Sequence, residues 1–316
     1  MSPSARLPDG IRVRLTVPAT SANLGPAFDA AGLALSLYDD VEVTTCSSGC
    51  TVDVSGEGAD TLPRDESHLV LRAARAGLDA AGLGQPGLAL RATNRIPHGR
   101  GLGSSAAATV AGLVAAREIA VAAGRDDVLD DAHLLGLATQ FEGHADNVGA
   151  TLCGGLTLVW AESATSVRSV RLDVDQRVVP VVLVPEATLS TARARGLIPP
   201  SVPHRIAARN AGRAALLVAA LTSRPSLLLP ATHDWLHQPY RAGAFPESMA
   251  LVDALRAEGH AATISGAGPS VLVLTTRDST PVAVDIPGWR CLSLEVDRLG
   301  AAAVERSEEA ARSTRR

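Results

Sequence analysis

The sequence of 316 residues contains no lysine, and all 29 of its basic residues are arginine. A lysine Schiff base, a lysine general base and the lysine of a P-loop are therefore excluded. Aromatic residues are also rare, at 3%, and the formal net charge is −4. Proteins that bind nucleic acid present a basic face, often interleaved with aromatic residues, so the sequence predicts no nucleic-acid partner.

Cysteine and long hydrophobic segments are scarce as well. The four cysteines are Cys46, Cys50, Cys153 and Cys291. They form no C-x2-C pair and no dense framework, so neither a zinc site nor disulfides are expected. The uncharged residues 101–116 are too few and too rich in glycine, serine and threonine to span a bilayer, and residues 1–18 lack the apolar segment of a signal peptide. We therefore expect a cytoplasmic enzyme without a membrane partner.

The chain length favours two domains, because 316 residues exceed the usual size of one hydrophobic core. Hydrophobic periodicity predicts an α+β protein. Strands are predicted near residues 11–17, 41–45, 51–55, 88–92, 155–160, 178–185, 261–265 and 271–275, and helices near 71–81, 104–123, 205–222 and 247–258. The first strand is expected to stop at Pro18. The polar segment 161–177 predicts a boundary that gives domains 1–165 and 166–316, with residues from about 301 fraying as a tail.

A glycine-rich loop precedes the helix predicted from residue 104. It consists of Pro97, His98, Gly99, Arg100, Gly101, Leu102, Gly103, Ser104, Ser105, Ala106 and Ala107. Its glycines let backbone N–H groups approach an anion without Cβ clashes, and the hydroxyls of Ser104 and Ser105 suit phosphate or Mg²⁺. The alternative is a tight strand-to-helix turn in which Ser104 is an ordinary N-cap. Two other phosphate motifs are excluded, because the spacing is not G-x-G-x-x-G and a Walker A loop needs lysine.

Two further turns are rich in small residues. Residues 18–29 read PATSANLGPAFD, with Asn23 and Asp29 as polar groups, and residues 265–270 read SGAGPS. Each turn alone is typical of an ordinary loop or hairpin. Together with the glycine-rich loop, and in this order, they resemble the three signatures of the GHMP kinase superfamily, with Ala27 where glycine is usual. The resemblance runs from about residue 12 to about residue 275.

This resemblance implies a two-domain fold, in which an N-terminal domain like domain 2 of ribosomal protein S5 is followed by a ferredoxin-like domain. It implies that ATP lies along residues 97–107, with Gly266 and Gly268 beside it. Superfamily members similar to mevalonate kinase use an aspartate–lysine pair near the transferred proton, and no such pair can exist without lysine. The adenine contacts stay open, because His68 stands in a segment where family members often carry asparagine.

Residues 142–149, EGHADNVG, gather two carboxylates, a histidine and an amide within one short segment. Such a cluster is too polar for a core without a reason, and Glu142 is a candidate Mg²⁺ ligand. The alternative is a helix end with solvated charges. The segment resembles the E-G-H-P-D-N-V element of the homoserine kinase branch, with Ala145 in place of proline. That resemblance makes Glu142, with Ser105, the metal ligand and places His144 and Asn147 in the substrate pocket.

Arginine is the residue best suited to hold an amino-acid carboxylate, through a planar bidentate pair. Residues 190–195 read STARAR and residues 238–241 read QPYR. These are similar to two elements of the same branch, which implicates Thr191, Arg195 and Arg241. Arg193 is the alternative to Arg195, and the spacing from Thr191 favours Arg195.

The resemblance as a whole implies Mg-ATP-dependent phosphorylation of the L-homoserine side-chain hydroxyl to O-phospho-L-homoserine, a step of threonine biosynthesis. Asn23, Asp29, Thr191 and Arg195 would form the catalytic set, and Asn23, Asp29, His144, Asn147, Arg195 and Arg241 would bind the substrate. The alternatives are another GHMP kinase, for shikimate or an isoprenoid intermediate, and a non-catalytic protein of this fold that binds a metabolite. The oligomeric state stays open, with a homodimer as one option.

Overall fold

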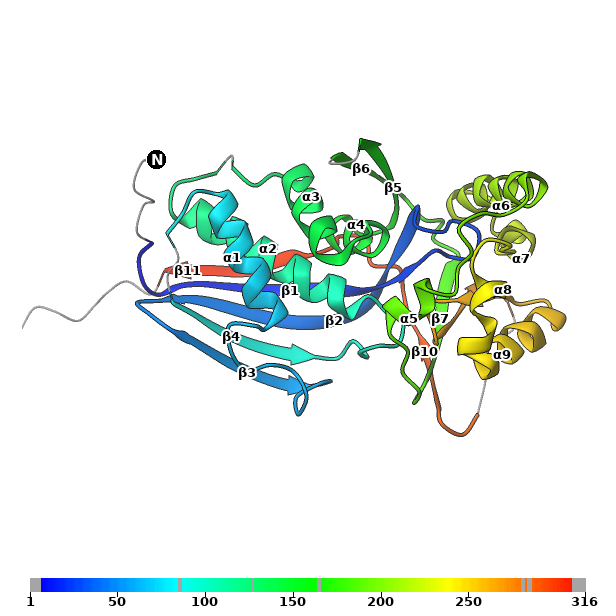
Figure 1. Cartoon of the computed structure of the whole chain (residues 1–316), viewed down its shortest axis with the longest axis horizontal. Helices are drawn as coiled ribbons and strands as arrows, with labels where there is room; N and C mark the ends of the chain where they lie inside the picture. Colours follow the sequence, from blue (N-terminus) through cyan, green and yellow to red (C-terminus); the bar gives the residue numbers. More distant parts are fainter. Residues whose placement is uncertain are drawn as a thin grey trace, which may run out of the picture.

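The structure is a computed structural model that describes residues 7–84, 87–126, 128–163, 166–279, 282 and 286–308. Two sheets follow one another along the molecule, each with its own helices (Figure 1). The expected α+β pattern is confirmed, and every strand and helix that periodicity predicted is present. Most bounds agree within a few residues, but the strand predicted near residues 41–45 begins ten residues earlier, at Ala31.

The larger sheet forms most of the first half of the chain. Its strands are β1 (Ile11–Ala22), β2 (Ala31–Cys46), β3 (Cys50–Gly56), β4 (Gly87–Asn94), β5 (Leu156–Ser163), β6 (Ser166–Leu172) and β11 (Ala302–Glu308). They are ordered β11-β1-β2-β4-β3, while β5 pairs with β2 and β6. The associated helices are α1 (Leu69–Ala80), α2 (Ser104–Ala122), α3 (Asp131–Glu142) and α4 (Asp146–Cys153), which lie together over one face of the sheet (Figure 1).

The period-2 pattern of β1 buries Ile11, Val13, Leu15 and Val17 beneath these helices, as expected. The strand does not stop at Pro18, however. The β1–β2 register shifts between Pro18 and Ala19, and pairing continues to Ala22. An irregularity of this kind accommodates a residue that has no N–H to donate, so a proline need not end the strand.

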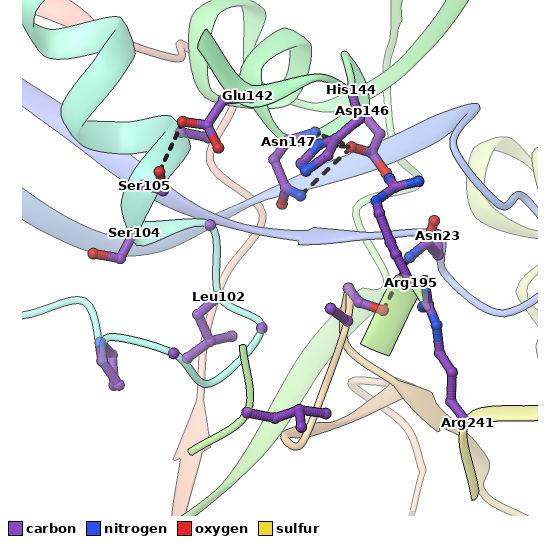
Figure 2. Close-up of a pocket in the computed structure, with 18 residues that line it drawn as sticks. Asn23, Leu102, Ser104, Ser105, Glu142, His144, Asp146, Asn147, Arg195 and Arg241 are labelled. Carbon is purple, nitrogen blue, oxygen red and sulfur yellow. Dashed lines mark hydrogen bonds and ion pairs between the residues drawn. The ribbon is translucent and has the colours of Figure 1, made fainter. Parts of the chain in front are cut away.

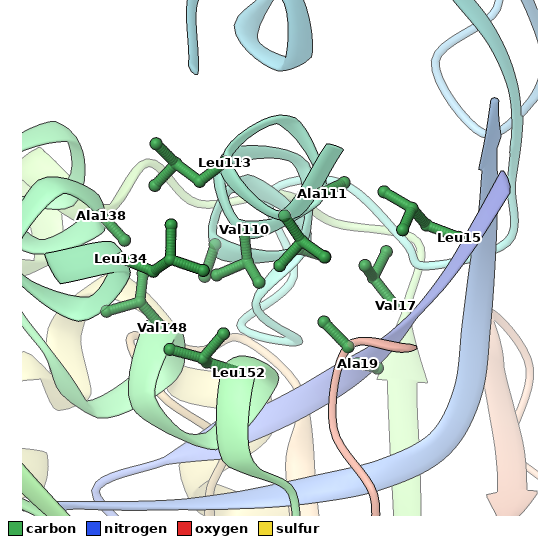
Figure 3. Packing of buried hydrophobic residues seen from close by; sticks show 14 of the residues in the cluster. Leu15, Val17, Ala19, Val110, Ala111, Leu113, Leu134, Ala138, Val148 and Leu152 are labelled. Carbon is green, nitrogen blue, oxygen red and sulfur yellow. The ribbon is translucent and has the colours of Figure 1, made fainter. Parts of the chain in front are cut away.

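Helix α2 is the central element of this domain. Most of its length is buried, and Figure 3 shows Val110 of α2 beside Leu134 of α3 and Val148 of α4. A Cβ at Gly112 would overlap the backbone oxygen of Val70, so glycine there permits the close approach of α1 and α2. By length and composition alone α2 could cross a membrane, but its burial among the other helices and β1 is that of a core helix.

The second sheet is antiparallel, in the order β10-β7-β9-β8, with β7 (Val178–Pro185), β8 (Ala261–Ile264), β9 (Val271–Thr276) and β10 (Trp289–Ser293). The helices of this half are α5 (Thr191–Arg195), α6 (His204–Thr222), α7 (Leu228–Ala231), α8 (Gln238–Arg241) and α9 (Pro246–Ala257), with the 3-10 turns η1 (Pro225–Leu227) and η2 (Ala242–Ala244). Leu217, Leu228 and Leu272 join the core cluster of the first domain, so the apolar contact continues between the two halves.

The prediction of a frayed tail from about residue 301 is wrong for residues 302–308. These residues form β11, which pairs antiparallel with β1 from Ile11↔Glu308 to Thr16↔Ala302. The end of the described chain therefore returns to the N-terminal sheet, and residues 309–316 lie outside the described part. The boundary between residues 165 and 166 stays a prediction, and the larger sheet extends beyond it, because β6 pairs with β5.

Candidate active site

Three turns meet where the two halves of the molecule join: the turn after β1, the β4–α2 loop and the β8–β9 turn. Ser265 Oγ donates to the carbonyl oxygen of Gly101 over 2.7 Å, and the Gly266 N–H donates to Ala22 O over 3.0 Å. Asn23 Nδ2 donates to Gly266 O over 2.9 Å. A Cβ at Gly101 would overlap Ser265 O, so the close contact requires glycine. The three sequence motifs therefore form one structural unit.

The N-terminus of α2 points its backbone N–H groups at this junction. The N-cap residue is Gly103, at φ +71°, and it has no side-chain capping bond. A Cβ on Gly103 would overlap Thr20 Oγ1. The alternative in which Ser104 caps the helix is therefore wrong, because Ser104 is already the first helical residue. A long helix whose first N–H groups have no side-chain cap is a favourable anion site.

An oxygen-rich pair lies beside this helix start. Ser105 Oγ donates to Glu142 Oε1 over 2.7 Å, and Thr109 Oγ1 donates to the same oxygen over 2.9 Å. Hard oxygen donors of this kind are what Mg²⁺ prefers, and nucleotide phosphates usually complete its shell. In the described part of the chain no three His, Cys, Asp or Glu side chains come together, so a metal ion here would depend on such phosphate oxygens. Ser105 and Glu142 thus fit the predicted ion.

The segment after α3 forms a polar wall. Gly143, at φ +76°, ends α3, and His144 Nδ1 lies 3.1 Å from Asp146 Oδ1. The hydrogen bond with Asp146 raises the pKa of His144 above its ordinary value, although burial opposes the change. Asp146 is 2% exposed and also accepts the Asn147 N–H over 2.8 Å. Asp146 was not among the predicted site residues, and its place between His144 and Asn147 was the signal that could have found it.

The two implicated arginines reach the same wall from the second half of the chain. Arg195 forms a bidentate ion pair with Asp29, at 2.6 and 3.0 Å. Arg241 is 1% exposed, and its Nε donates to Ala194 O over 3.2 Å. No carboxylate among the described residues forms an ion pair with Arg241, and burial, followed by the nearby Arg195 charge, lowers its pKa. An arginine buried without a counter-ion is costly, so its presence points to an anionic ligand.

Most of the predicted residues line one cavity (Figure 2). Its lining comprises Asn23, Pro97, Gly99, Gly101, Leu102, Gly103, Ser104, Ser105, Ala106, Glu142, His144, Asp146, Asn147, Leu189, Arg195, Arg241, Gly266 and Ala267. Asp29 does not line the cavity itself, but it contacts two residues that do. Its carboxylate pairs with Arg195, and its backbone N–H donates to the Asn23 side chain. Arg193 is exposed and does not line the cavity, which favours Arg195 as predicted.

Five predicted residues lie elsewhere or are only partly described. Arg100 turns its guanidinium to Pro185 O and Glu186 O, each at 2.9 Å, so its side chain bridges to the second half. Ala107 is in the core, and Gly268 packs on Phe245. His98 lines a neighbouring cavity. Thr191 begins α5, but its side chain lies outside what the structure describes.

The neighbouring cavity is mostly apolar and shares Gly99, Ser104 and Ser105 with the first. Its other lining residues are Val17, Asp39, Val41, Leu62, Pro63, Ser67, His68, Leu69, Val70, Asn94, His98 and Ala108. His68 Nδ1 accepts the Val70 N–H over 3.3 Å, so Nε2 carries the ring proton. Nε2 is buried and has no hydrogen-bond partner among the residues that the structure describes, and burial lowers the pKa of His68. Burial also raises the pKa of Asp39 to about 6.

Comparison with known proteins agrees with this geometry. The family description GHMP kinases N terminal domain matches residues 68–155, and GHMP kinases C terminal matches residues 213–284. The homoserine kinase of Streptomyces avermitilis is 57% identical over 292 residues, which cover 92% of this chain and 94% of that protein. The homoserine kinase of Mycobacterium tuberculosis is 48% identical over 286 residues, which cover 89% and 90%.

Solved structures show the same relationship. The homoserine kinase of Cytophaga hutchinsonii has a TM-score of 0.79 at 25% identity and covers 93% of this chain and 97% of its own. A mevalonate diphosphate decarboxylase from Staphylococcus aureus shares the fold, with a TM-score of 0.64 at 17% identity. The chain therefore belongs to the GHMP kinases, and the predicted two-domain fold is confirmed. Within that class, the extent of sequence identity makes it a member of the homoserine kinases.

Proposed function

We propose that this protein transfers the γ-phosphoryl group of ATP to the side-chain hydroxyl of L-homoserine, which yields O-phospho-L-homoserine for threonine biosynthesis. The observation that carries the proposal is the buried Arg241, which has no carboxylate partner among the described residues and lines the same cavity as the uncapped start of α2. One end of the cavity thus suits a small carboxylate and the other suits phosphates. An acceptor whose carboxylate is bound at the first end must therefore present a hydroxyl towards the phosphates at the second.

ATP would place its phosphates on the β4–α2 loop, where glycines leave N–H groups free and the α2 dipole favours negative charge. The purine would occupy the adjoining apolar cavity, which continues from Gly99 and Ser105. The buried Nε2–H of His68 then gains an acceptor, since purine ring nitrogens accept hydrogen bonds.

Ser105 and Glu142 would hold Mg²⁺ against the phosphates. The chemistry that the ion supplies is neutralisation of the charge that develops on the phosphoryl group. The other residues hold the acceptor. Arg241 binds the homoserine carboxylate, and Arg195 can add a bond without leaving Asp29, because a guanidinium has five donors.

The substrate ammonium would face Asp146, whose buried carboxylate lies on the same wall of the cavity. Asn23 would direct the hydroxyl towards the phosphates, and its side chain is held in place by the bond from Nδ2 to Gly266 O. Phosphoryl transfer has a loose transition state, so in-line placement and charge neutralisation supply most of the acceleration without a strong base. The lack of lysine is therefore compatible with catalysis.

The direct test is ADP release with Mg-ATP and a panel of alcohols: L-homoserine, L-serine, L-threonine, shikimate and mevalonate. L-homoserine is expected to give the highest kcat/KM, because its hydroxyl is one methylene further from the carboxylate than that of L-serine. A higher kcat/KM with shikimate or mevalonate would instead identify the protein as a GHMP kinase for that alcohol. No turnover with any of these alcohols would favour a non-catalytic protein of this fold that binds a metabolite. Cytoplasmic location, a homodimer and the absence of nucleic-acid and membrane partners stay predictions.

Substitution of His68 by alanine is expected to raise the KM for ATP about 3- to 10-fold, the usual worth of one neutral hydrogen bond. The KM for L-homoserine should not change, because His68 lines only the apolar cavity. The measurement is steady-state kinetics with each substrate varied in turn. His133→Ala is a matched control, since His133 lies on the surface of α3, 66% exposed. Equal KM values for ATP in both variants would remove His68 from the nucleotide site.

A further inference from the structure

His237, the residue before α8, lies directly behind Arg241 and does not itself line the cavity. Its side chain is completely buried. Nε2 lies 2.8 Å from the carbonyl oxygen of Gly25, and Nδ1 lies 3.3 Å from Nη1 of Arg241. A carbonyl only accepts and a guanidinium only donates. The ring must therefore be neutral, with its proton on Nε2 and a lone pair on Nδ1 that accepts from Arg241.

Several contacts hold the ring in this position. Asp234 accepts the backbone N–H groups of His237 and Gln238, at 3.1 and 2.7 Å, which fixes the turn before α8. Phe28 stacks on the imidazole with the ring centres 5.2 Å apart. The same Phe28 ring lies 5.3 Å from the Arg241 guanidinium. The ring can therefore neither turn over nor withdraw without disturbing both halves of the site.

The charges around the ring agree with a neutral imidazole. Asp234, 3.5 Å from Nε2, and the more distant Asp29 favour protonation of the His237 ring. The positive charge of Arg241 opposes it. Burial has the largest effect, and it lowers the pKa of His237 below its ordinary value. A further positive charge beside Arg241, in addition to that of Arg195, is thereby avoided.

Neutrality has a consequence for ligand binding. A carboxylate in place of the imidazole would orient Arg241 equally well, but it would also neutralise the guanidinium and compete with an anionic substrate. A neutral acceptor orients the guanidinium and leaves its charge for the ligand. The bond to Gly25 also ties α8 to the turn after β1, which carries Asn23.

We propose that His237 is a positioning residue for carboxylate recognition: its neutral ring aims Arg241 at the substrate and links it to the turn after β1. The inference rests on the proposed function, because the anion that Arg241 binds is taken to be the homoserine carboxylate. It adds a residue that lies outside the cavity and that the sequence motifs did not indicate.

The test compares three substitutions of similar size. His237→Asn places an amide oxygen near the position of Nδ1 and can still accept from Arg241. His237→Asp has the same shape but adds a negative charge, and His237→Gln can reach only the Gly25 oxygen. We expect the Asn variant to keep a KM for L-homoserine within about threefold of the parent protein, and the Asp and Gln variants to raise it about tenfold or more. The KM for ATP should stay constant in all three.

The inference is overturned if Asn, Asp and Gln give the same KM for L-homoserine, or if the KM values for ATP and L-homoserine rise together, as a purely structural role would produce. If the Asp variant does not fold, the Asn and Gln pair decides the matter alone. The parent protein is assayed first with L-homoserine. Its inactivity would reject the proposed function, and the role of His237 with it, whereas an active parent with equivalent variants would reject only the role of His237.

Discussion

Arg241→Met is expected to raise the KM for L-homoserine about 100-fold or more, because it removes one partner of the buried charge pair that Arg241 forms with the substrate carboxylate. The protein without ligand is expected to be no less stable than the parent. In the free protein Arg241 is 1% exposed and has no carboxylate partner in the described part of the chain. Methionine fills a similar volume without a buried charge. Binding energy and folding stability should therefore move in opposite directions, which a general disruption of the fold would not produce.

The measurements are kinetics with each substrate varied and thermal unfolding with and without L-homoserine. Arg193→Met is the matched control, because Arg193 is an exposed arginine on α5 and does not line the cavity. We expect the thermal shift caused by L-homoserine to be lost in Arg241→Met and kept in Arg193→Met. An equal rise of the KM values for ATP and L-homoserine in Arg241→Met would contradict the assigned contact.

The parts of the fold that the sequence predicted well are those set by local pattern. Residues 104–122 form a helix because they are rich in alanine and carry few charges, and the loop before it is contiguous in sequence. The anion site therefore follows from one short segment. The three signature motifs could be placed together only by resemblance, because nothing in their composition shows that Ser265 contacts Gly101.

The tail was mispredicted for a physical reason. β11 is an edge strand whose side chains are largely exposed on both faces, so it has no alternation of apolar and polar residues to reveal it. Its position depends on backbone pairing with β1, almost the whole chain length away. Composition alone made these residues look like a solvated terminus.

The site itself shows a similar limit. The motifs implicated Asp29 and Arg195 as separate substrate contacts, yet the two pair with each other across 166 positions of the chain. The burial of Arg241 likewise depends on elements that are far apart in sequence. Residue types and spacing can indicate which groups belong to a site, but not which of them already satisfy one another before a ligand arrives.

The largest loss of turnover is expected from Glu142→Gln. It should lower kcat on the order of 100-fold, which is the usual effect of removing a preorganised transition-state contact. It should also raise the Mg²⁺ concentration needed for the half-maximal rate. The amide keeps an oxygen that can accept from Ser105 and Thr109, so helix packing should not change. It lacks the negative charge that would hold the ion against the phosphates. The loss should therefore appear in kcat and in the Mg²⁺ dependence, with little change in the KM for L-homoserine.

Ser105→Ala should act in the same direction, since it removes the other oxygen of the pair. Glu118→Gln is the matched control: Glu118 lies on α2 and pairs with Arg117 and Arg306, each at 3.5 Å, away from the cavity. Titration of Mg²⁺ at saturating ATP separates the three variants. If Glu142→Gln and Ser105→Ala both keep the Mg²⁺ dependence of the parent protein, neither residue holds the ion, and charge neutralisation during transfer must come from the arginines and the start of α2 alone.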